Sequence, residues 1–299
     1  MNILALGTIA LDTIKTPSGK RTDILGGSAC HFAMAARHFI KVSLVSVVGQ
    51  DFPKAYRDFL KKKGFDLHSV TVLRGHTFIW KGEYKKDFNV AITRRTELGV
   101  LPRFKPRLSA HQKNIKTVFL ANLDPDIQAC LLGQMHNPRL VALDSMNYWI
   151  RHKPKSLKRL MKKVDIYFCN DAEAKSLTKE HNLFKAAEAL RKFGPRIVII
   201  KKGEHGVLLS CDNAKMNLPA YPVKKLVDPT GAGDSFAGGF LGYLARRKRI
   251  SLDNLKKALV YGTVIASFNV EKFGTERTAR LNTKEINQRV SEFKNIIPI

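Results

Sequence analysis

The sequence predicts a three-layer α/β fold, in which a mostly parallel, Rossmann-like central sheet lies between helices. Short apolar runs bounded by turn residues alternate with helix-length amphipathic segments along most of the 299 residues. Such runs are typical of strands that are buried on both faces of a parallel sheet. We predict these strands at 3–9, 42–48, 118–120, 140–143, 164–169 and 197–201.

The predicted helices fill the intervals between these strands and most of the C-terminal third. They span 28–39, 53–63, 126–136, 156–163, 184–193, 233–247 and 252–270. Residues 207–210 and 215–218 form a predicted hairpin. The strand-like runs at 70–73, 77–81 and 89–93 follow one another without helices. We therefore predict one domain, residues 1–299, with a β lid at about 70–100 near the ligand crevice at the carboxyl ends of the parallel strands.

The chain is strongly basic, with 52 Lys and Arg against 25 Asp and Glu and a net charge of +27. Such a balance attracts nucleic acid, anionic surfaces and phosphorylated ligands. The basic residues form short clusters and no long stripe with aromatics, so we favour a solvated enzyme surface over a nucleic-acid-binding protein. Four cysteines without C-x-x-C spacing favour a reducing, cytoplasmic location. No apolar run reaches membrane-spanning length, so we expect no membrane partner.

The most informative motif is D-P-T-G-A-G-D at residues 228–234, which continues into a long apolar, helix-compatible stretch. A helix that begins here leaves the backbone N–H groups of Gly231, Ala232 and Gly233 free for an anion. Asp234 then lies where it could remove a proton from a hydroxyl that attacks a phosphate. The structural alternative is a helix start with glycines for packing and an aspartate cap. The length of the motif favours the functional interpretation.

Two earlier segments are candidates for binding a small polar acceptor. Asp12 follows the first predicted strand, where its carboxylate could accept hydrogen bonds from sugar hydroxyls or simply cap a turn. Gly26 and Gly27 precede a small-residue helix and permit close approach of the backbone to a ligand. His31 falls on the first turn of that helix, as a ligand contact or as a polar surface group.

Two later segments suit a nucleotide. Asn170 and Glu173 follow a predicted strand, where they could cap a helix, order water around a phosphate-bound Mg²⁺, or do both. Lys202, Gly203 and Gly206 form a basic turn after the strand at 197–201, either around phosphates or ribose or as a hairpin turn. The motifs of P-loop enzymes, of G-x-S-x-G hydrolases and of H-E-x-x-H metalloproteases do not occur.

Taken together in chain order, these segments resemble the ribokinase-like (PfkB) family of carbohydrate and nucleoside kinases over nearly the whole chain. The resemblance implies a β-lidded α/β fold that transfers the γ-phosphoryl group of ATP to a hydroxymethyl group. The resemblance implies that Asp234 is the base and that Gly231, Ala232 and Gly233 form the anion hole. It implies that the acceptor is bound by Asp12, Gly26, Gly27, His31 and Asp124, and that ATP is bound by Asn170, Lys202, Gly203, Gly206 and Gly233. It also implies that Glu173 binds Mg²⁺ through water and that Asp228, with the loop near Gly274, binds a monovalent cation such as K⁺.

The acceptor site departs from ribokinase proper. Ala10 and Ser28 replace the Asn and Lys of ribokinases, and His31 replaces a common Asn, which makes ribose a poor choice. Phe78 and Trp80 in the lid, with the aromatic pair at 148–149, could form an apolar wall that suits a nucleobase, or could pack in the core or in a homodimer contact through the lid. We rank a sugar slightly above a nucleoside as the acceptor. The intact motif argues against a non-catalytic nucleotide sensor.

Overall fold

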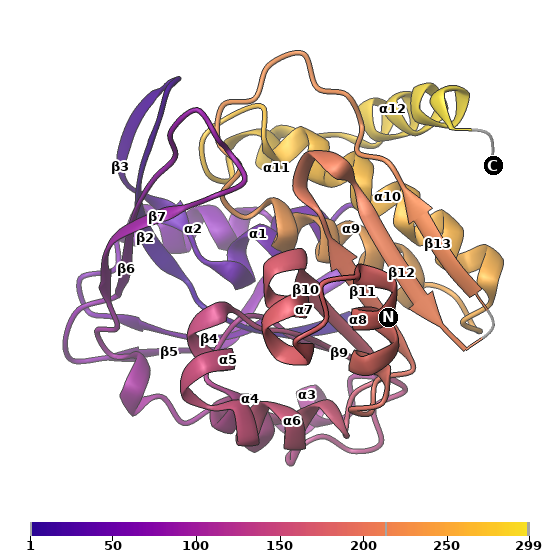
Figure 1. The fold of residues 1–299 in the computed structure, drawn as a ribbon. Coiled ribbons are helices and arrows are strands. Elements are labelled where there is room, and N and C mark those ends of the chain that lie inside the picture. The colour runs from indigo at the N-terminus through magenta and orange to yellow at the C-terminus, as the bar shows by residue number, and fades with distance from the viewer. Residues whose placement is uncertain (1, 213, 298–299) are drawn as a thin grey trace.

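The computed structural model describes residues 2–212 and 214–297, which form two β-sheets flanked by helices (Figure 1). The larger sheet has nine strands in this described part of the chain. They are β1 (Asn2–Leu6), β4 (Lys41–Gly49), β5 (Asp66–Leu73), β8 (Thr117–Leu120), β9 (Leu140–Asp144), β10 (Ile166–Asn170), β11 (Ile197–Lys201), β12 (Val207–Cys211) and β13 (Ala214–Leu218). Their spatial order is β13-β12-β11-β10-β9-β8-β1-β4-β5, and all neighbours from β11 to β5 are parallel. The strand order changes direction beside β1, which is where such sheets bind ligands.

Helices cover both faces of this sheet. One face carries α1 (Ser28–Ala36), α2 (Lys54–Lys62), α9 (Ala232–Ala245), α10 (Leu252–Asn269), α11 (Glu276–Arg280) and α12 (Thr283–Ile296). The other carries α3 (Ala110–Lys113), α4 (Pro125–Leu132), α5 (Asn147–His152), α6 (Pro154–Met161), α7 (Asp171–Thr178) and α8 (Leu183–Arg191). Two short 3₁₀ helices are η1 (Leu101–Arg103) and η2 (Gly203–His205). The predicted three-layer fold is confirmed, and no helix among the described residues is long and apolar enough to cross a membrane.

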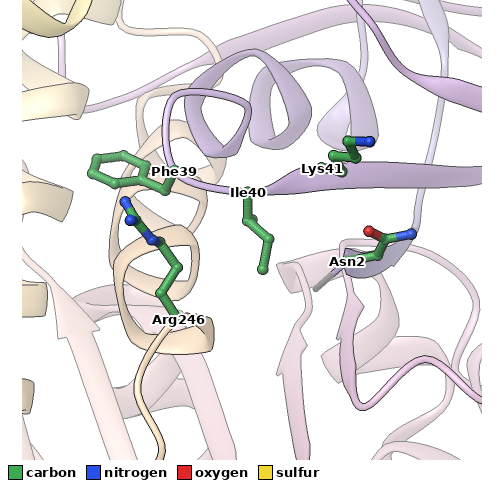
Figure 2. A pocket seen from close by; sticks show the side chains of 5 residues that line it. All are labelled: Asn2, Phe39, Ile40, Lys41 and Arg246. Carbon is green, nitrogen blue, oxygen red and sulfur yellow. The ribbon is translucent and has the colours of Figure 1, made fainter.

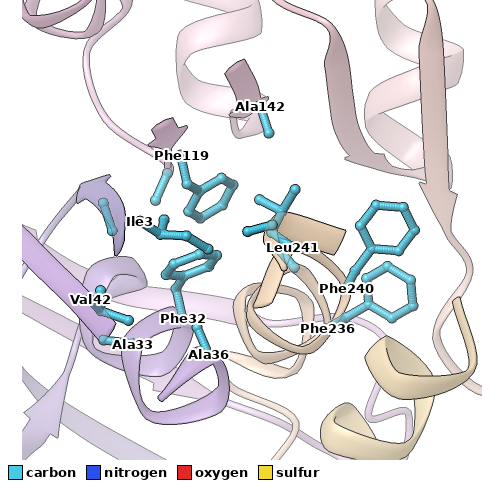
Figure 3. Close-up of a cluster of buried hydrophobic side chains, with 14 of the residues drawn as sticks. Ile3, Phe32, Ala33, Ala36, Val42, Phe119, Ala142, Phe236, Phe240 and Leu241 are labelled. Carbon is cyan, nitrogen blue, oxygen red and sulfur yellow. The ribbon is translucent and has the colours of Figure 1, made fainter. Parts of the chain in front are cut away.

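The core between α1, α9 and the sheet determines where α9 lies. Phe32 of α1 stacks on Phe119 of β8, with ring centroids 4.2 Å apart, and Phe236 and Phe240 of α9 extend the same cluster (Figure 3). α9 approaches α1 closely because Gly238 has no side chain. A Cβ there would lie only 2.4 Å from the carbonyl oxygen of Phe32. This close packing brings the N-terminus of α9 to the carboxyl ends of the parallel strands.

The smaller sheet is a lid with the strand order β3-β2-β6-β7. Its strands are β2 (Ala10–Thr16), β3 (Gly19–Gly26), β6 (Phe78–Glu83) and β7 (Ile92–Glu97). The prediction placed residues 70–73 in the lid, but they belong to β5, which pairs with β4 in the large sheet. β2 and β3, which supply half of the lid, were not predicted. β1 ends at Leu6, and the chain then leaves the large sheet.

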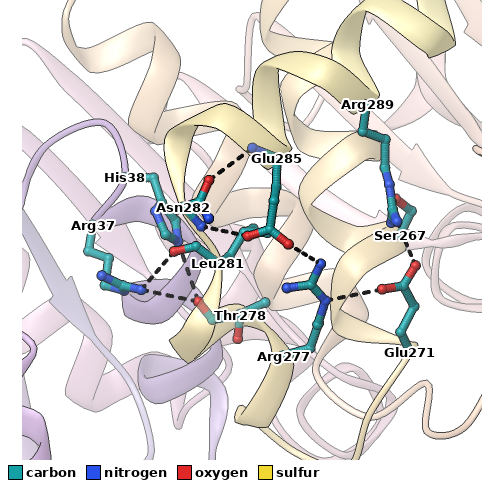
Figure 4. A network of polar contacts seen from close by, with 10 residues as sticks. All are labelled: Arg37, His38, Ser267, Glu271, Arg277, Thr278, Leu281, Asn282, Glu285 and Arg289. Carbon is teal, nitrogen blue, oxygen red and sulfur yellow. Dashed lines mark hydrogen bonds and ion pairs between the residues drawn. The ribbon is translucent and has the colours of Figure 1, made fainter.

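A polar network holds the C-terminal helices against α1 and α10 (Figure 4). Arg277 donates to Glu271 at 3.2 Å and to Glu285 at 2.6 Å, and Arg289 donates to Glu271 at 2.7 Å. Arg37, which follows α1, donates to the carbonyl oxygens of residues 278, 279 and 281. The network therefore fixes the end of α10, where Asn269 enters the candidate site.

Candidate active site

The turn before α9 has the geometry of an anion site. Gly231 has φ +73°, and a Cβ there would collide with the His31 ring at 2.1 Å. Among the described residues, nothing accepts a hydrogen bond from the backbone N–H of Gly233 or Asp234. These donors point from the positive end of a helix of 14 residues. The predicted anion hole needs one correction: the N–H of Ala232 closes the turn instead, onto the carbonyl oxygen of Pro229 at 3.1 Å.

Asp234 lies in the first turn of α9, half-buried among other carboxylates. Burial, followed by the negative charges of Asp144 and Glu173, raises its pKa to about 8, against an opposing effect of Lys201. A carboxyl group with a pKa near the working pH can accept a proton and release it again. The environment of Asp234 therefore suits a general base.

Lys201 and Asp144 form a buried ion pair beside this turn, and neither is among the predicted site residues. Lys201 ends β11, Asp144 ends β9, and the ammonium donates to Asp144 Oδ2 at 2.6 Å. A Cβ on Gly233 would lie 3.0 Å from Lys201 Nζ, so the ammonium lies at the first turn of α9. Burial alone would lower the pKa of Lys201, but the charges of Asp144 and Glu173 keep it above its usual value. A signal was present in the sequence, since Lys201 ends a predicted parallel strand and Asp144 directly follows another.

Asn170 and Glu173 form a reciprocal capping box at the start of α7. Asn170 Oδ1 accepts from the Glu173 N–H, and Glu173 Oε2 accepts from the Asn170 N–H, both at 2.8 Å. Burial and the nearby charge of Asp144 raise the pKa of Glu173 to about 7. No three His, Cys, Asp or Glu side chains of residues 2–212 and 214–297 converge to hold a metal ion directly. Binding of Mg²⁺ by Glu173 through water stays a prediction.

Asp12 lies on lid strand β2, not at the end of a parallel strand as predicted. Its carboxylate occupies the space beside Gly26, where a Cβ would lie 1.9 Å from Asp12 Oδ2. Gly27, with φ +91°, leads into α1, and a Cβ there would collide with the Thr8 carbonyl oxygen at 2.4 Å. Burial raises the pKa of Asp12 to about 7, while a hydrogen bond from the Gly27 backbone opposes this and the charge of Asp228 adds to it. The two glycines therefore make room for the carboxylate and for the tight turn.

His31 is buried, with 1% of its surface exposed, so a surface position for it is wrong. Burial lowers its pKa to about 4, which keeps the ring neutral. Its Nδ1 lies 3.1 Å from Asn269 Oδ1, and Asn269 Nδ2 donates to the Thr230 carbonyl oxygen at 2.8 Å. The ring also packs on Gly231. His31 thus supports the turn before α9, and a direct contact with the acceptor stays a prediction.

Asp124 and Asp228 are each engaged by the protein. Asp124 caps α4 through the Asp126 N–H and accepts from Lys153 Nζ at 2.7 and 2.9 Å. Asp228 is fully buried and accepts from the backbone N–H groups of Thr230 and Gly274, both at 2.8 Å. These contacts explain both carboxylates structurally, and their roles at an acceptor and at a cation stay predictions.

The turn at 202–206 lies between the lid and the β12–β13 hairpin. Lys202 Nζ donates to Asn217 Oδ1 at 2.6 Å, on the hairpin. Gly203 has φ +56°, and a Cβ there would lie 2.1 Å from Asn89 Oδ1, in the lid loop between β6 and β7. Gly206 has φ +83° and lies against the carbonyl oxygen of Leu218. The lid loop therefore closes over this turn, and contacts with ATP stay predictions.

Trp80 lies beside Asp12 in the lid. The two residues are register partners of the parallel strands β2 and β6, so their side chains emerge on the same face. The indole extends over Gly82, where a Cβ would lie 2.0 Å from the ring, and packs with Ile14. Phe78 instead packs with the apolar cluster on the face of the large sheet that carries α3 to α8. It therefore does not form one wall with Trp80.

Two cavities lie away from this constellation. One, of about 400 Å³, is lined by Asn2, Phe39, Ile40, Lys41 and Arg246 (Figure 2). The other, of about 510 Å³, also borders Asn2 and extends along the starts of β8 and β9. Both lie at the amino ends of the parallel strands, whereas Asp144, Lys201 and Asp234 lie at the carboxyl ends. We place the chemistry with the charged side chains, because α/β sheets of this type bind ligands at the carboxyl ends.

Comparison with known proteins agrees with this geometry. Residues 114–281 match the pfkB family of carbohydrate kinases. A cytidine kinase of Thermococcus kodakarensis is 30% identical over 87% of this chain and 96% of its own length. A ribokinase of Staphylococcus aureus is 31% identical over 43% of this chain and 42% of its own. The structure of a Burkholderia thailandensis nucleoside kinase in complex with ADP-inosine has a TM-score of 0.80 at 19% identity, covering 98% of this chain and 96% of its own.

The protein therefore belongs to the pfkB family. It is a kinase, a phosphotransferase with an alcohol group as acceptor.

Proposed function

We propose that this kinase transfers the γ-phosphoryl group of ATP to the 5′-hydroxymethyl group of a nucleoside, with Asp234 as general base. The observation that carries the reaction is the position of Asp234 beside backbone N–H donors that have no acceptor in the described part of the chain. In the reaction, the acceptor oxygen bonds to the γ-phosphorus, the bond from that phosphorus to the β–γ bridging oxygen breaks, and Asp234 takes the hydroxyl proton. The amides of Gly233 and Asp234 stabilise the charge on the moving phosphoryl group.

Mg²⁺ fits the carboxylates of this site. Asp144, Glu173 and Asp234 lie around the ammonium of Lys201. Burial, and after it the negative charge of Asp144, raises the pKa of Glu173 and of Asp234. A bound Mg²⁺ would neutralise phosphate charge, with Glu173 ordering its waters. We also assign Asp12 to the acceptor hydroxyls and the turn at 202–206 to the nucleotide. K⁺ at Asp228 has less support, because both carboxylate oxygens already accept backbone hydrogen bonds.

A nucleoside acceptor is favoured over a bare sugar by two observations. Trp80 shares a lid face with Asp12, so an apolar ring lies next to the carboxylate that we assign to the sugar hydroxyls. The cytidine kinase matches over most of both chains, whereas the ribokinase matches less than half of either chain. A sugar kinase is the second candidate, since residues 114–281 match a carbohydrate kinase family.

The test is ADP formation with a panel of ribonucleosides, ribose and hexoses, in the presence of Mg²⁺ and ATP. We expect kcat/KM for at least one nucleoside to exceed that for every free sugar. Asp234→Asn should lower kcat by about 10²–10⁴-fold, and Asp253→Asn on the surface should not. A sugar as the best substrate would refute the nucleoside assignment, and near-normal turnover of Asp234→Asn would refute the base.

The cellular location and the macromolecular partners of the enzyme are also part of the proposal. All four cysteines are free thiols, which supports a cytoplasmic location. A homodimer through the lid stays a prediction. Binding of nucleic acid has the charge of +27 as its support, and we do not propose it.

A further inference from the structure

The pair of Lys201 and Asp144 lies where a phosphate would arrive. The exposed fractions of the two side chains are 18% and 5%, so both charges are largely removed from water. β10 separates β11 from β9, and the lysine reaches across its end to Asp144. Burial raises the pKa of Asp144, and the ammonium of Lys201 opposes that shift. A buried ion pair needs further hydrogen-bond partners, because both charges have lost their hydration.

The Lys201 ammonium has N–H donors that no described residue accepts. It can donate three hydrogen bonds, and in the described residues it donates one, to Asp144. It also lies close enough to Gly233 for a Cβ there to be 3.0 Å from Nζ. The free N–H groups of Gly233 and Asp234 belong to the same turn. A cation and two amide donors thus converge on one small volume, which suits an anion.

Lys202, the next residue, is arranged differently. Its ammonium bonds to Asn217 on the β12–β13 hairpin, and burial lowers its pKa, whereas that of Lys201 is raised. The lysine that points into the carboxylate cluster is therefore Lys201.

We propose that Lys201 binds the γ-phosphoryl group of ATP during transfer, and that Asp144 is the positioning residue that holds the ammonium against the first turn of α9. This inference rests on ATP as the phosphoryl donor. Lys201 moves no proton: it stays an ammonium and offsets charge on the non-bridging oxygens while the acceptor proton passes to Asp234. Asp144 keeps its carboxylate and its hydrogen bond to Lys201 throughout.

The direct test compares nucleotides with and without the γ-phosphate. In Lys201→Met, calorimetry should show a loss of at least about tenfold in affinity for a non-hydrolysable ATP analogue, the value of one charge-assisted hydrogen bond. The affinity for ADP should change by less than about threefold. The kcat should fall by about 10²–10³-fold with little change in KM for the acceptor. Lys257→Met, which removes an exposed lysine paired with Asp253, controls for the loss of one positive charge.

Loss of one buried partner can weaken the fold, so a second variant is needed. Asp144→Asn combined with Lys201→Met removes both charges of the pair, and its Tm should return toward that of the wild type. Its kcat should stay as low as that of Lys201→Met. Recovery of activity together with Tm would overturn the proposal, because it would assign the pair a structural role. An equal loss of affinity for ADP and for the ATP analogue would overturn it as well.

The pH dependence of kcat/KM distinguishes the effect of Lys201 from that of Asp144. Lys201 lowers the pKa of Asp234 and Asp144 raises it. The acid limb of kcat/KM should therefore move to higher pH in Lys201→Met and to lower pH in Asp144→Asn. Shifts in the same direction would contradict the assignment. The nucleotide-binding test needs no acceptor, so it still decides on Lys201 if the nucleoside assignment fails.

Discussion

At Gly231, two independent constraints act on one residue. Its φ of +73° disfavours any side chain, and the His31 ring occupies the place of a Cβ. Gly231→Ala should therefore destabilise the protein by about 1–3 kcal/mol and lower kcat more than about tenfold, because the amides behind it would move. Thermal unfolding and steady-state kinetics measure both effects.

A double-mutant cycle with His31→Asn identifies the cause of that loss. If the collision with the ring contributes, the shorter side chain should recover part of the Tm lost in Gly231→Ala, and the two changes should not be additive. Additive changes in Tm would show that the backbone conformation alone is responsible. His31→Asn by itself should affect kcat more than the affinity for the acceptor, since the ring supports the turn.

The residues that could be predicted are those whose role is set by their neighbours in the sequence. The glycines and Asp234 form one short motif, and Asn170 and Glu173 form a local capping box, so the start of α9 and the start of α7 could be predicted. Lys201 and Asp144 are 57 residues apart, and their contact exists only because β9 and β11 flank β10. No local pattern distinguishes Lys201 from the adjacent Lys202.

At the scale of elements, the contact between α1 and α9 sets the position of the turn where we propose that catalysis occurs. Gly238→Ala would place a Cβ 2.4 Å from the carbonyl oxygen of Phe32, which is backbone and cannot rotate away. We expect a loss of about 1–3 kcal/mol of stability and a lower kcat, because α9 must shift away from α1. Urea unfolding checks the stability.

Gly133→Ala is the matched control, since its φ is −64° and the nearest atom to an added Cβ is 3.5 Å away. It should be neutral or stabilise by about 0.4–1 kcal/mol. If Gly238→Ala were as stable as this control, the close packing of α9 on α1 would not be the constraint that we infer.

The lid illustrates why some elements were predicted and others were missed. Strands at 42–48 and 197–201 are continuous apolar runs, which match β4 and β11 closely. β2 and β3 mix apolar and charged residues and lack the continuous apolar runs of the buried strands. The lid also joins segments far apart in the chain, because β2 pairs in parallel with β6. Such pairing depends on the tertiary fold and leaves no local signal.

For the molecule as a whole, the buried titratable groups determine how stability depends on pH. Asp12, Glu173 and Asp234 have pKa values raised to about 7, 7 and 8, so the folded state holds protons that the unfolded state releases near pH 4. The stability that they contribute is present at low pH and is lost as pH rises toward about 8. His31 and His38, whose pKa values burial lowers to about 4, act in the opposite direction, but only below about pH 6.5.

Above pH 6.5 the carboxyl groups therefore act alone, and the Tm of the ligand-free protein should fall between pH 6.5 and 8.5. Each kcal/mol lost corresponds to about 2–4 °C. Asp234→Asn should show a smaller fall, because it removes the group with the highest of these pKa values. Mg²⁺ with an ATP analogue should raise Tm more at pH 8.5 than at pH 6.5, since ionised carboxylates favour the cation. Differential scanning calorimetry between pH 6.5 and 8.5 tests the predicted fall in Tm. A Tm that is constant or rises with pH would mean that these carboxyl groups are not held protonated by the fold.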